Sequence, residues 1–246
     1  MPRQLTLPIL DTSRSVAELL PGVVHVPDWL DLDEQRRLVD AFGQWALPPA
    51  GLRHPRMPTG QVMSVQSVCL GWHWRPYAYS RTADDVDGAP VKPMPRDLVA
   101  LSRAAVAAAY GERSDAARAY APDAALVNLY SPDARLGLHQ DAEEPSTAPV
   151  VTISLGESCV FRLAGVDRRT GPFVDVELRS GDLLVFGEPN RRIFHGVPKV
   201  LADTGPAWSR PRRGPAQHHR ARDRPARRRA RRDLPPGTSL SGSGRI

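Results

Sequence analysis

The sequence predicts a mainly β fold, a β-sandwich or jelly roll, with helices packed on its outside. From Ala125 onward the chain is a series of short apolar runs separated by Pro, Gly and Asp. Short strands at regular spacing are typical of antiparallel β architectures. The preceding half contains two amphipathic helical patterns. With 246 residues, 41% of them hydrophobic, the chain can bury one sizeable core.

The N-terminal half alternates between regular and irregular segments. Residues 1–21 show little periodicity and are predicted to be an extension. The segment "VVHVPDWLDLDEQRRLVDAF" predicts a strand and then a helix that begins near Asp31. Residues 46–60 form a Pro-rich loop, "QVMSVQSVCL" alternates like a strand, and "GWHWRPYAYSRTADDVDGAP" predicts a long aromatic loop. A second helix is predicted in "PRDLVALSRAAVAAAYG", with Pro95 near its start and Gly111 just past its end.

The C-terminal half is predicted to be all strand, as far as about residue 203. The runs are "ALVNLYSP", "RLGLHQD", "VVTISLGESCVFRLAG", "FVDVELRSGDLLVFG" and "RRIFHGV". Each is short and ends at Pro, Gly or Asp, as expected for strands joined by turns. We therefore predict one domain over residues 22–204.

The charge of the chain is concentrated in its tail. Residues 207–246 hold 12 Arg against 2 Asp, whereas residues 1–206 hold 21 basic against 25 acidic side chains. The sequence pI of about 9.9 is therefore a property of the tail and not of the domain. We predict that residues 205–246 are a disordered Arg/Pro-rich tail. A genuine basic tail that binds nucleic acid or acidic partners is the alternative.

The remaining composition indicates a cytoplasmic protein, which we expect to be monomeric. No apolar run approaches membrane-spanning length, and the N-terminus lacks the pattern of a signal peptide. Cys69 and Cys159 are isolated. Two buried thiols are a better interpretation of them than a disulfide or a metal pair.

One cluster of residues suggests metal chemistry. In "LGLHQD", His139 and Asp141 share one face of a predicted strand and lie at its end. His195 follows at another predicted strand end, in "IFHGV". Two histidines and a carboxylate on a β scaffold are the ligands of the facial triad that binds non-haem Fe(II). The alternative is a strand-end histidine that is hydrogen-bonded to a neighbour.

The surrounding residues resemble a known family. "NLYSPDARLGLHQDAEE" is similar to the hallmark of the AlkB family of Fe(II)/2-oxoglutarate dioxygenases, and "VVTISLGESCVFRLAG", "SGDLLVFG" and "RRIFHGV" resemble its following strands. The likeness covers roughly residues 22–203. It implies a double-stranded β-helix, with Fe(II) held by His139, Asp141 and His195. It also implies that alkylated DNA or RNA is demethylated, with release of formaldehyde, succinate and CO2.

The resemblance also assigns residues around the metal. Those expected at 2-oxoglutarate are Asn128, Tyr130 and Leu126. Upstream, "MPTGQVMSVQSVCLGWHWRPYAYS" resembles the family's nucleotide-recognition lid, which places Trp72, Tyr77 and Tyr79 around the flipped base. Glu143 matches an acidic residue near the base, and Arg168 matches a basic residue at the pocket rim. Ordinary packing or surface positions are the alternative for each of these side chains.

The sequence departs from the family after His195. The family clamps the distal carboxylate of 2-oxoglutarate with an arginine in Arg-x-Asn-x-Thr-x-Arg on the final strand, and no such strand is predicted here. Shifted by one base, codons for Pro215–Asp223, "PAQHHRARD", can read Arg-Leu-Asn-Ile-Thr-Val-Arg-Val. We infer a frameshift near residues 204–207 that leaves the final strand missing or scrambled.

Two alternatives to nucleic-acid demethylation remain open. One is a 2-oxoglutarate hydroxylase that acts on a protein or a small molecule. The other is a catalytically dead nucleic-acid-binding module, in which the body is intact, the cofactor clamp is lost and the basic tail supplies affinity. The sequence does not rank DNA against RNA, or single strands against duplex.

Overall fold

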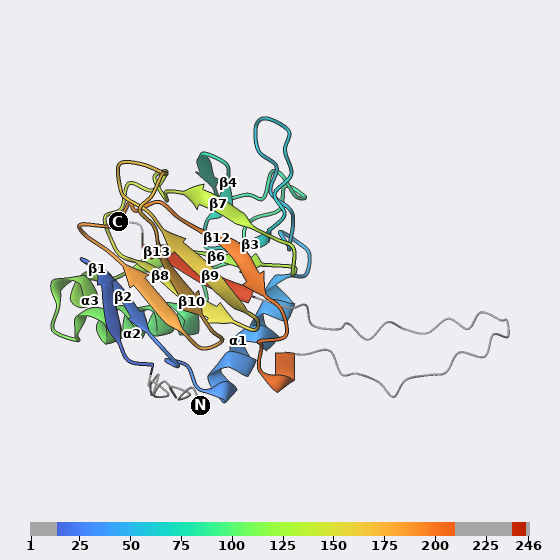
Figure 1. The fold of residues 1–246 in the computed structure, drawn as a ribbon. Helices are drawn as coiled ribbons and strands as arrows, with labels where there is room; N and C mark the ends of the chain where they lie inside the picture. The colour runs from blue at the N-terminus through green and yellow to red at the C-terminus, as the bar shows by residue number, and fades with distance from the viewer. Residues whose placement is uncertain (1–13, 210–237, 245–246) are drawn as a thin grey trace, which may run out of the picture.

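The computed structural model describes residues 14–209 and 238–244, and these form two facing antiparallel sheets with helices on one side (Figure 1). The larger sheet has the strand order β1-β2-β11-β8-β13-β6-β3. Its strands are β1 (Ala17–Leu20), β2 (Val23–Val26), β3 (Gln66–Leu70), β6 (Pro122–Leu129), β8 (Val150–Leu155), β11 (Leu183–Phe186) and β13 (Thr238–Gly244). The expected mainly β, jelly-roll class is therefore confirmed.

The smaller sheet has the order β10-β9-β12-β7. It consists of β7 (Leu136–His139), β9 (Ser158–Leu163), β10 (Val174–Leu178) and β12 (His195–Leu201). A separate hairpin of β4 (His73–Arg75) and β5 (Ala78–Ser80) follows β3. The sequence predicts an irregular loop there. Runs of only three residues are too short to show a period of two.

The helices cover the outer face of the larger sheet (Figure 1). They are α1 (Leu32–Trp45), α2 (Arg96–Tyr110) and the short α3 (Asp115–Ala119), and a 3-10 turn follows at Ala207–Ser209. Asp31 caps α1, and its side chain accepts hydrogen bonds from the backbone N–H groups of Asp33 and Glu34. Gly111 ends α2 with a φ of 88°, which favours glycine. Both predicted helices are confirmed.

The larger sheet is buried on both faces, and strand β11 shows why its sequence is continuously apolar. Leu183 and Val185 belong to the core under the helices, whereas Leu184 and Phe186 belong to the core between the two sheets. Successive side chains of a strand point to opposite faces. A strand covered on both sides therefore reads as an unbroken apolar run rather than as an alternation.

Two segments differ from the sequence expectations. Residues 1–21 are predicted to be an extension, but Ala17–Leu20 pair with β2 as the outer strand of the larger sheet. The final strand is predicted to be missing or scrambled, in a tail over residues 205–246. Thr238–Gly244 lie between β6 and β8 and pair with both, whereas residues 210–237 of the predicted tail lie outside the described residues. An open slot there would leave backbone groups of two buried strands unpaired, which is costly. A seven-residue segment without proline can fill it.

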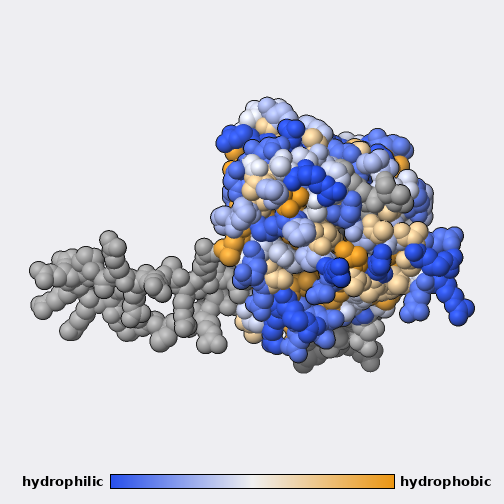
Figure 2. All heavy atoms as spheres, turned by 180° about the vertical axis from the view of Figure 1, so that it is seen from behind, coloured by the Kyte–Doolittle hydropathy of each residue, from blue (hydrophilic) through white to orange (hydrophobic). Residues whose placement is uncertain are grey.

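The helices of the described residues run for at most 15 residues. Within the described ranges, no helix has the length and apolar character needed to cross a bilayer. Figure 2 shows that hydrophilic side chains cover most of the reverse face, with hydrophobic ones in small groups. Cys69 and Cys159 are both buried and free, as expected.

A buried carboxylate ties the start of the described chain to the turn before β11. The Asp182 side chain is fully buried. It accepts hydrogen bonds from the ring of His25 at 3.0 Å, from Arg14 and from the backbone N–H groups of Asp28 and Arg179. Burial raises the pKa of Asp182, but the bonds from His25, Arg14 and the two backbone groups outweigh it and lower the pKa.

Replacing Asp182 by Asn is expected to reduce the free energy of unfolding by on the order of 3–5 kcal/mol, the usual effect of breaking a buried charge pair. Because the folded-state pKa is lowered, the contribution of Asp182 is complete above the unfolded pKa of about 4 and is lost as the pH falls below it. Urea denaturation of both proteins between pH 7 and pH 3 checks this. A difference in stability that stays constant on acidification would contradict it.

Candidate metal centre

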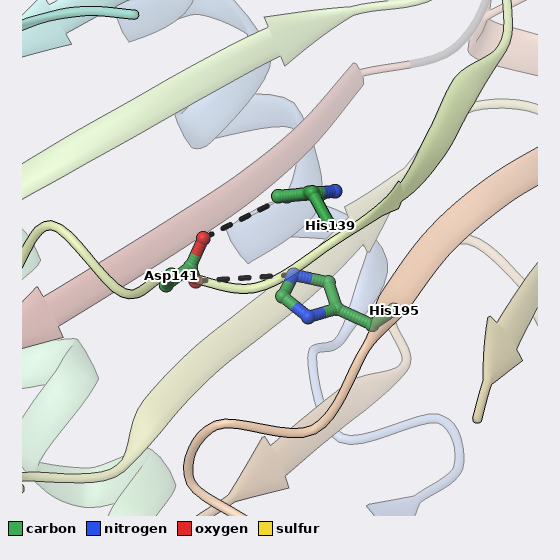
Figure 3. Close-up of side chains that lie close together, drawn as sticks. All are labelled: His139, Asp141 and His195. Atoms are coloured by element: carbon green, nitrogen blue, oxygen red, sulfur yellow. Dashed lines mark ion pairs between the residues drawn. The ribbon is translucent and has the colours of Figure 1, made fainter. Parts of the chain in front are cut away.

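Strands β7 and β12 are neighbours in the smaller sheet and place two histidines directly opposite each other. His139 is the last residue of β7, His195 is the first of β12, and the two are Cα partners in the antiparallel pairing. Asp141 follows β7 by two residues. Figure 3 shows the three side chains converging on one point at these strand ends. The sheet therefore brings together residues that are far apart in the sequence.

The geometry of the three side chains suits one small cation. Asp141 Oδ1 lies 3.6 Å from His139 Nε2, and Asp141 Oδ2 lies 3.8 Å from His195 Nε2. One ligand atom from each residue lies within 4.8 Å of the other two. The imidazole ring centres are 4.3 Å apart and tilted by 52°. Two imidazoles and one carboxylate on one side of a point are the donor set of the Fe(II) facial triad.

Backbone contacts select the tautomer of both histidines. His139 Nδ1 lies 3.0 Å from the carbonyl oxygen of Gly137, and His195 Nδ1 lies 3.1 Å from that of Ile193. A carbonyl can only accept, so each Nδ1 carries the proton and donates it. Each Nε2 is left with a lone pair that faces Asp141. This arrangement is the usual way in which a protein orients a metal-binding histidine.

The protonation states also favour metal binding. Burial and the neighbouring His139 lower the pKa of His195 to about 4, despite the opposing attraction of Asp141. Burial raises the pKa of Asp141, but attraction by His195, His139 and Arg191 outweighs it and lowers that pKa. At neutral pH the site therefore presents a neutral His195 and an ionised Asp141, which are the forms that bind metals.

A pocket opens beside the triad between the two sheets. Its lining includes all three residues that the resemblance places at 2-oxoglutarate: Leu126, Asn128 and Tyr130. They alternate along β6 and its end, so they share the inner face. The hydroxyl of Ser67 donates to Asn128 Oδ1 at 2.6 Å, which orients the amide. Thr152 and Ser154 of β8 add neutral polar groups to the lining.

The pocket fits the metal better than it fits a dicarboxylate. Among the described residues that line it, none is Lys or Arg. 2-Oxoglutarate carries two carboxylates, and only one of them can reach the metal together with the keto oxygen. The second needs a cationic partner to compensate for its loss of water. Within the described ranges, the pocket offers it neutral groups and the Asp141 carboxylate, and no cation.

None of the aromatic residues that the resemblance places around the base lines the pocket. Trp72 immediately precedes β4, its Nε1 donates to Asp123 Oδ2 at 2.8 Å, and the Arg81 guanidinium carbon lies 3.5 Å from the ring centre. One face of the indole is therefore covered.

Tyr77, at the hairpin tip, is 68% exposed and has a φ of 67°. Tyr79 is half-buried, and its hydroxyl donates to Glu144 Oε1 at 2.5 Å.

The two charged residues carried over by resemblance also lie outside the pocket lining. Glu143 is half-buried, and Arg168 is exposed in the turn between β9 and β10. Two other charged residues, Glu144 and Arg191, form a buried ion pair close in sequence to the metal ligands. Sequence reasoning missed both residues. The doubled charges in "DAEE" and "NRRIF" are the signal that could have indicated them.

Comparisons with known proteins agree with this geometry. The 2OG-Fe(II) oxygenase superfamily matches residues 22–230. "Alpha-ketoglutarate-dependent dioxygenase AlkB" of Escherichia coli is 38% identical over 156 residues, which are 61% of this chain and 68% of that protein. The AlkB homolog of Caulobacter vibrioides is 36% identical over 189 residues, covering 74% of this chain and 80% of that protein.

Plant proteins are similar as well. "DNA N(6)-methyladenine demethylase ALKBH1D" of Arabidopsis thaliana is 33% identical over 210 residues, covering 80% of this chain and 47% of that protein. This chain therefore spans about half the length of that relative. A solved structure described as "The structure of OsALKBH1" superposes with a TM-score of 0.69 at 28% identity, covering 94% of this chain and all of the other.

Proposed function

Because the chain belongs to the AlkB family of the 2OG-Fe(II) oxygenase superfamily, we propose that it oxidatively demethylates N-alkylated bases in DNA or RNA. The family's cofactors are Fe(II) and 2-oxoglutarate. The observation that carries the proposal is the convergence of His139, Asp141 and His195, with both Nε2 atoms facing one carboxylate. The names of the AlkB and demethylase relatives support the substrate class.

The proposed reaction consumes O2, 2-oxoglutarate and an N-methylated base. When bound, the iron and 2-oxoglutarate together supply a hydroxylating oxidant, with release of succinate and CO2. One oxygen atom of O2 would enter a C–H bond of the methyl group, and the other would enter succinate. The N–C bond of the resulting N–CH2OH group would then break, which releases formaldehyde. The electron pair of that bond stays on the base nitrogen, and the hydroxyl proton passes to the solvent where the alkylated base is a cation.

The residues of the chain provide placement and shielding for this reaction. His139, Asp141 and His195 would hold one side of the metal and leave the other side open. The backbone bonds at the two Nδ1 atoms keep the rings in place. The apolar side chains of the pocket lining, which include Phe161, would limit the access of water to the metal. The hairpin would hold the extruded base at the mouth, where aromatic side chains can stack on it.

Formaldehyde release tests the proposal directly. The purified protein is incubated with Fe(II), 2-oxoglutarate and a single-stranded oligonucleotide that contains N1-methyladenine or N3-methylcytosine. Formaldehyde and the restored base are expected in equal amounts. Oligonucleotide binding without formaldehyde would favour a catalytically dead binding module. Succinate formation with proteins or small molecules, but with no oligonucleotide, would favour the alternative hydroxylase.

Replacing Trp72 by Ala is expected to weaken oligonucleotide binding by roughly 1–3 kcal/mol, the size of one lost base stack. The base would use the indole face that Arg81 does not cover. Fluorescence anisotropy with a labelled methylated oligonucleotide measures the affinity. Trp72→Phe is the matched control, because it keeps an aromatic face and loses the indole N–H that bonds to Asp123. If Trp72→Ala binds as tightly as the unchanged protein, the assignment of the hairpin to the base is wrong.

A further inference from the structure

One buried carboxylate connects the hairpin to the metal centre. The Glu144 side chain is 3% exposed, and its two oxygens bond to different parts of the chain. Oε1 accepts from the hydroxyl of Tyr79 at 2.5 Å, and Oε2 accepts from Arg191 Nη2 at 2.7 Å. The Arg191 side chain is 1% exposed, so the ion pair is shielded from water. Such a pair is weakened little by salt.

The positions of these residues show which segments of the chain the contacts join. Glu144 follows Asp141 by three residues, and Arg191 precedes His195 by four. Tyr79 lies on β5, in the hairpin that sequence similarity assigns to the base. Arg191 also donates from Nε to the carbonyl oxygen of Ala148 at 2.5 Å, which fixes the segment between Glu144 and β8. The hairpin is therefore joined to both segments that carry metal ligands.

Stability does not explain why this pair is buried. Removing two charges from water is costly, and apolar replacements of buried ion pairs are often as stable or more stable. Arg191 Nη1 is also buried and has no hydrogen-bond partner among the described residues, which adds to the cost. A pair that is unfavourable in this way and lies between a substrate-binding element and a metal site is better explained by positioning.

We propose that Arg191 is a positioning residue that holds Glu144 where it can bind Tyr79, and so keeps hairpin β4–β5 closed against the metal centre. The proposal rests on the proposed function, because the closed hairpin is expected to bind the nucleic-acid strand. Arg191 itself touches no reactant in this scheme. Its effect on affinity passes through Glu144 and Tyr79, in that order.

Three variants separate positioning from folding. Arg191→Met leaves the Glu144 carboxylate buried without its cation, so it is expected to lose stability. The double variant Arg191→Met/Glu144→Met removes both charges and is expected to recover most of that stability. Tyr79→Phe removes only the hydroxyl that reaches Glu144. Its Co(II) titration is expected to match that of the unchanged protein, and its urea denaturation is expected to show only the loss of that one bond.

The decisive readout is amide hydrogen exchange of residues 73–80, followed by mass spectrometry on the full chain. Tyr79→Phe and the double variant are both expected to exchange these amides roughly tenfold faster, the effect of losing about one hydrogen bond to a charged group. Affinity for a methylated oligonucleotide is expected to fall by a similar factor. Arg191→Lys keeps the positive charge but lacks the planar guanidinium group. Its hairpin amides are expected to be protected from exchange better than those of Arg191→Met and less well than those of the unchanged protein.

One result would overturn the proposal. If the double variant recovers its stability and its hairpin amides exchange as slowly as those of the unchanged protein, the ion pair is structural only. The hairpin measurement needs neither substrate nor turnover. If no oligonucleotide binds to any of these proteins, the proposed function fails, while hydrogen exchange still decides whether Arg191 and Glu144 hold the hairpin.

Discussion

Restoring the reading frame after about residue 204 is expected to strengthen 2-oxoglutarate binding by roughly two to four decades, the equivalent of on the order of 3–5 kcal/mol for a buried charge that gains its partner. In the chain as it stands, the described lining of the pocket offers no Lys or Arg to the second carboxylate. Strand β13 does not change this. Its Ser239 pairs with Asn128 and Ser154, and no basic residue occurs in Thr238–Gly244.

The test compares this chain with a variant protein translated in the shifted frame, which would supply Arg-x-Asn-x-Thr-x-Arg to the same slot. Binding is measured by calorimetry with Co(II) present, and succinate production is measured with a methylated oligonucleotide. 2-Oxobutyrate is the matched control ligand, since it keeps the keto acid and lacks the second carboxylate. It is expected to bind both proteins alike.

Equal affinity of the two proteins for 2-oxoglutarate would refute the frameshift hypothesis. The carboxylate partner would then have to be sought among Arg210, Arg212 and Arg213, which lie outside the described residues. The alternative of a genuine basic tail would gain support if the unchanged chain bound the cofactor tightly. If the two proteins differ in their affinity for 2-oxoglutarate and not for 2-oxobutyrate, the unchanged chain lacks a partner for the distal carboxylate.

Replacing His139 by Ala is expected to abolish binding of Fe(II) or Co(II), because it removes one of three ligands and leaves Asp141 facing only His195. Spectral titration with Co(II) measures the site directly. His54→Ala is the matched control, since His54 is exposed and its ring contacts the carbonyl oxygen of Met63. An unchanged titration in His139→Ala would show that the triad does not bind the metal.

Much of the site was predictable from the sequence because its ligands lie at strand ends with fixed spacing. His139 and Asp141 are two residues apart, so a period of two places them on one side wherever the strand is formed. Leu126, Asn128 and Tyr130 follow the same rule, and the structure lines one pocket with all three. That His139 and His195 become Cα partners depends on pairing between distant strands, which the family resemblance indicated and periodicity alone did not.

The hairpin and the buried ion pair were less accessible to sequence reasoning. Strands of three residues carry too little pattern to be recognised, so the sequence around Tyr79 predicts a loop. Glu144 and Arg191 are separated by 47 residues, and charged side chains are usually exposed. Only the folded chain shows that both are buried and that they join the hairpin to the metal-binding segments.

By itself, the sequence determined the fold class, both long helices and the identity of the candidate metal ligands, because local periodicity and residue spacing encode these features. The tertiary structure decided which strands are neighbours, and it added Ala17–Leu20 and Thr238–Gly244 to the larger sheet. It also set the tautomers of His139 and His195 through backbone carbonyls. Such features depend on contacts between distant segments, whose free energies are settled only when the whole core is packed.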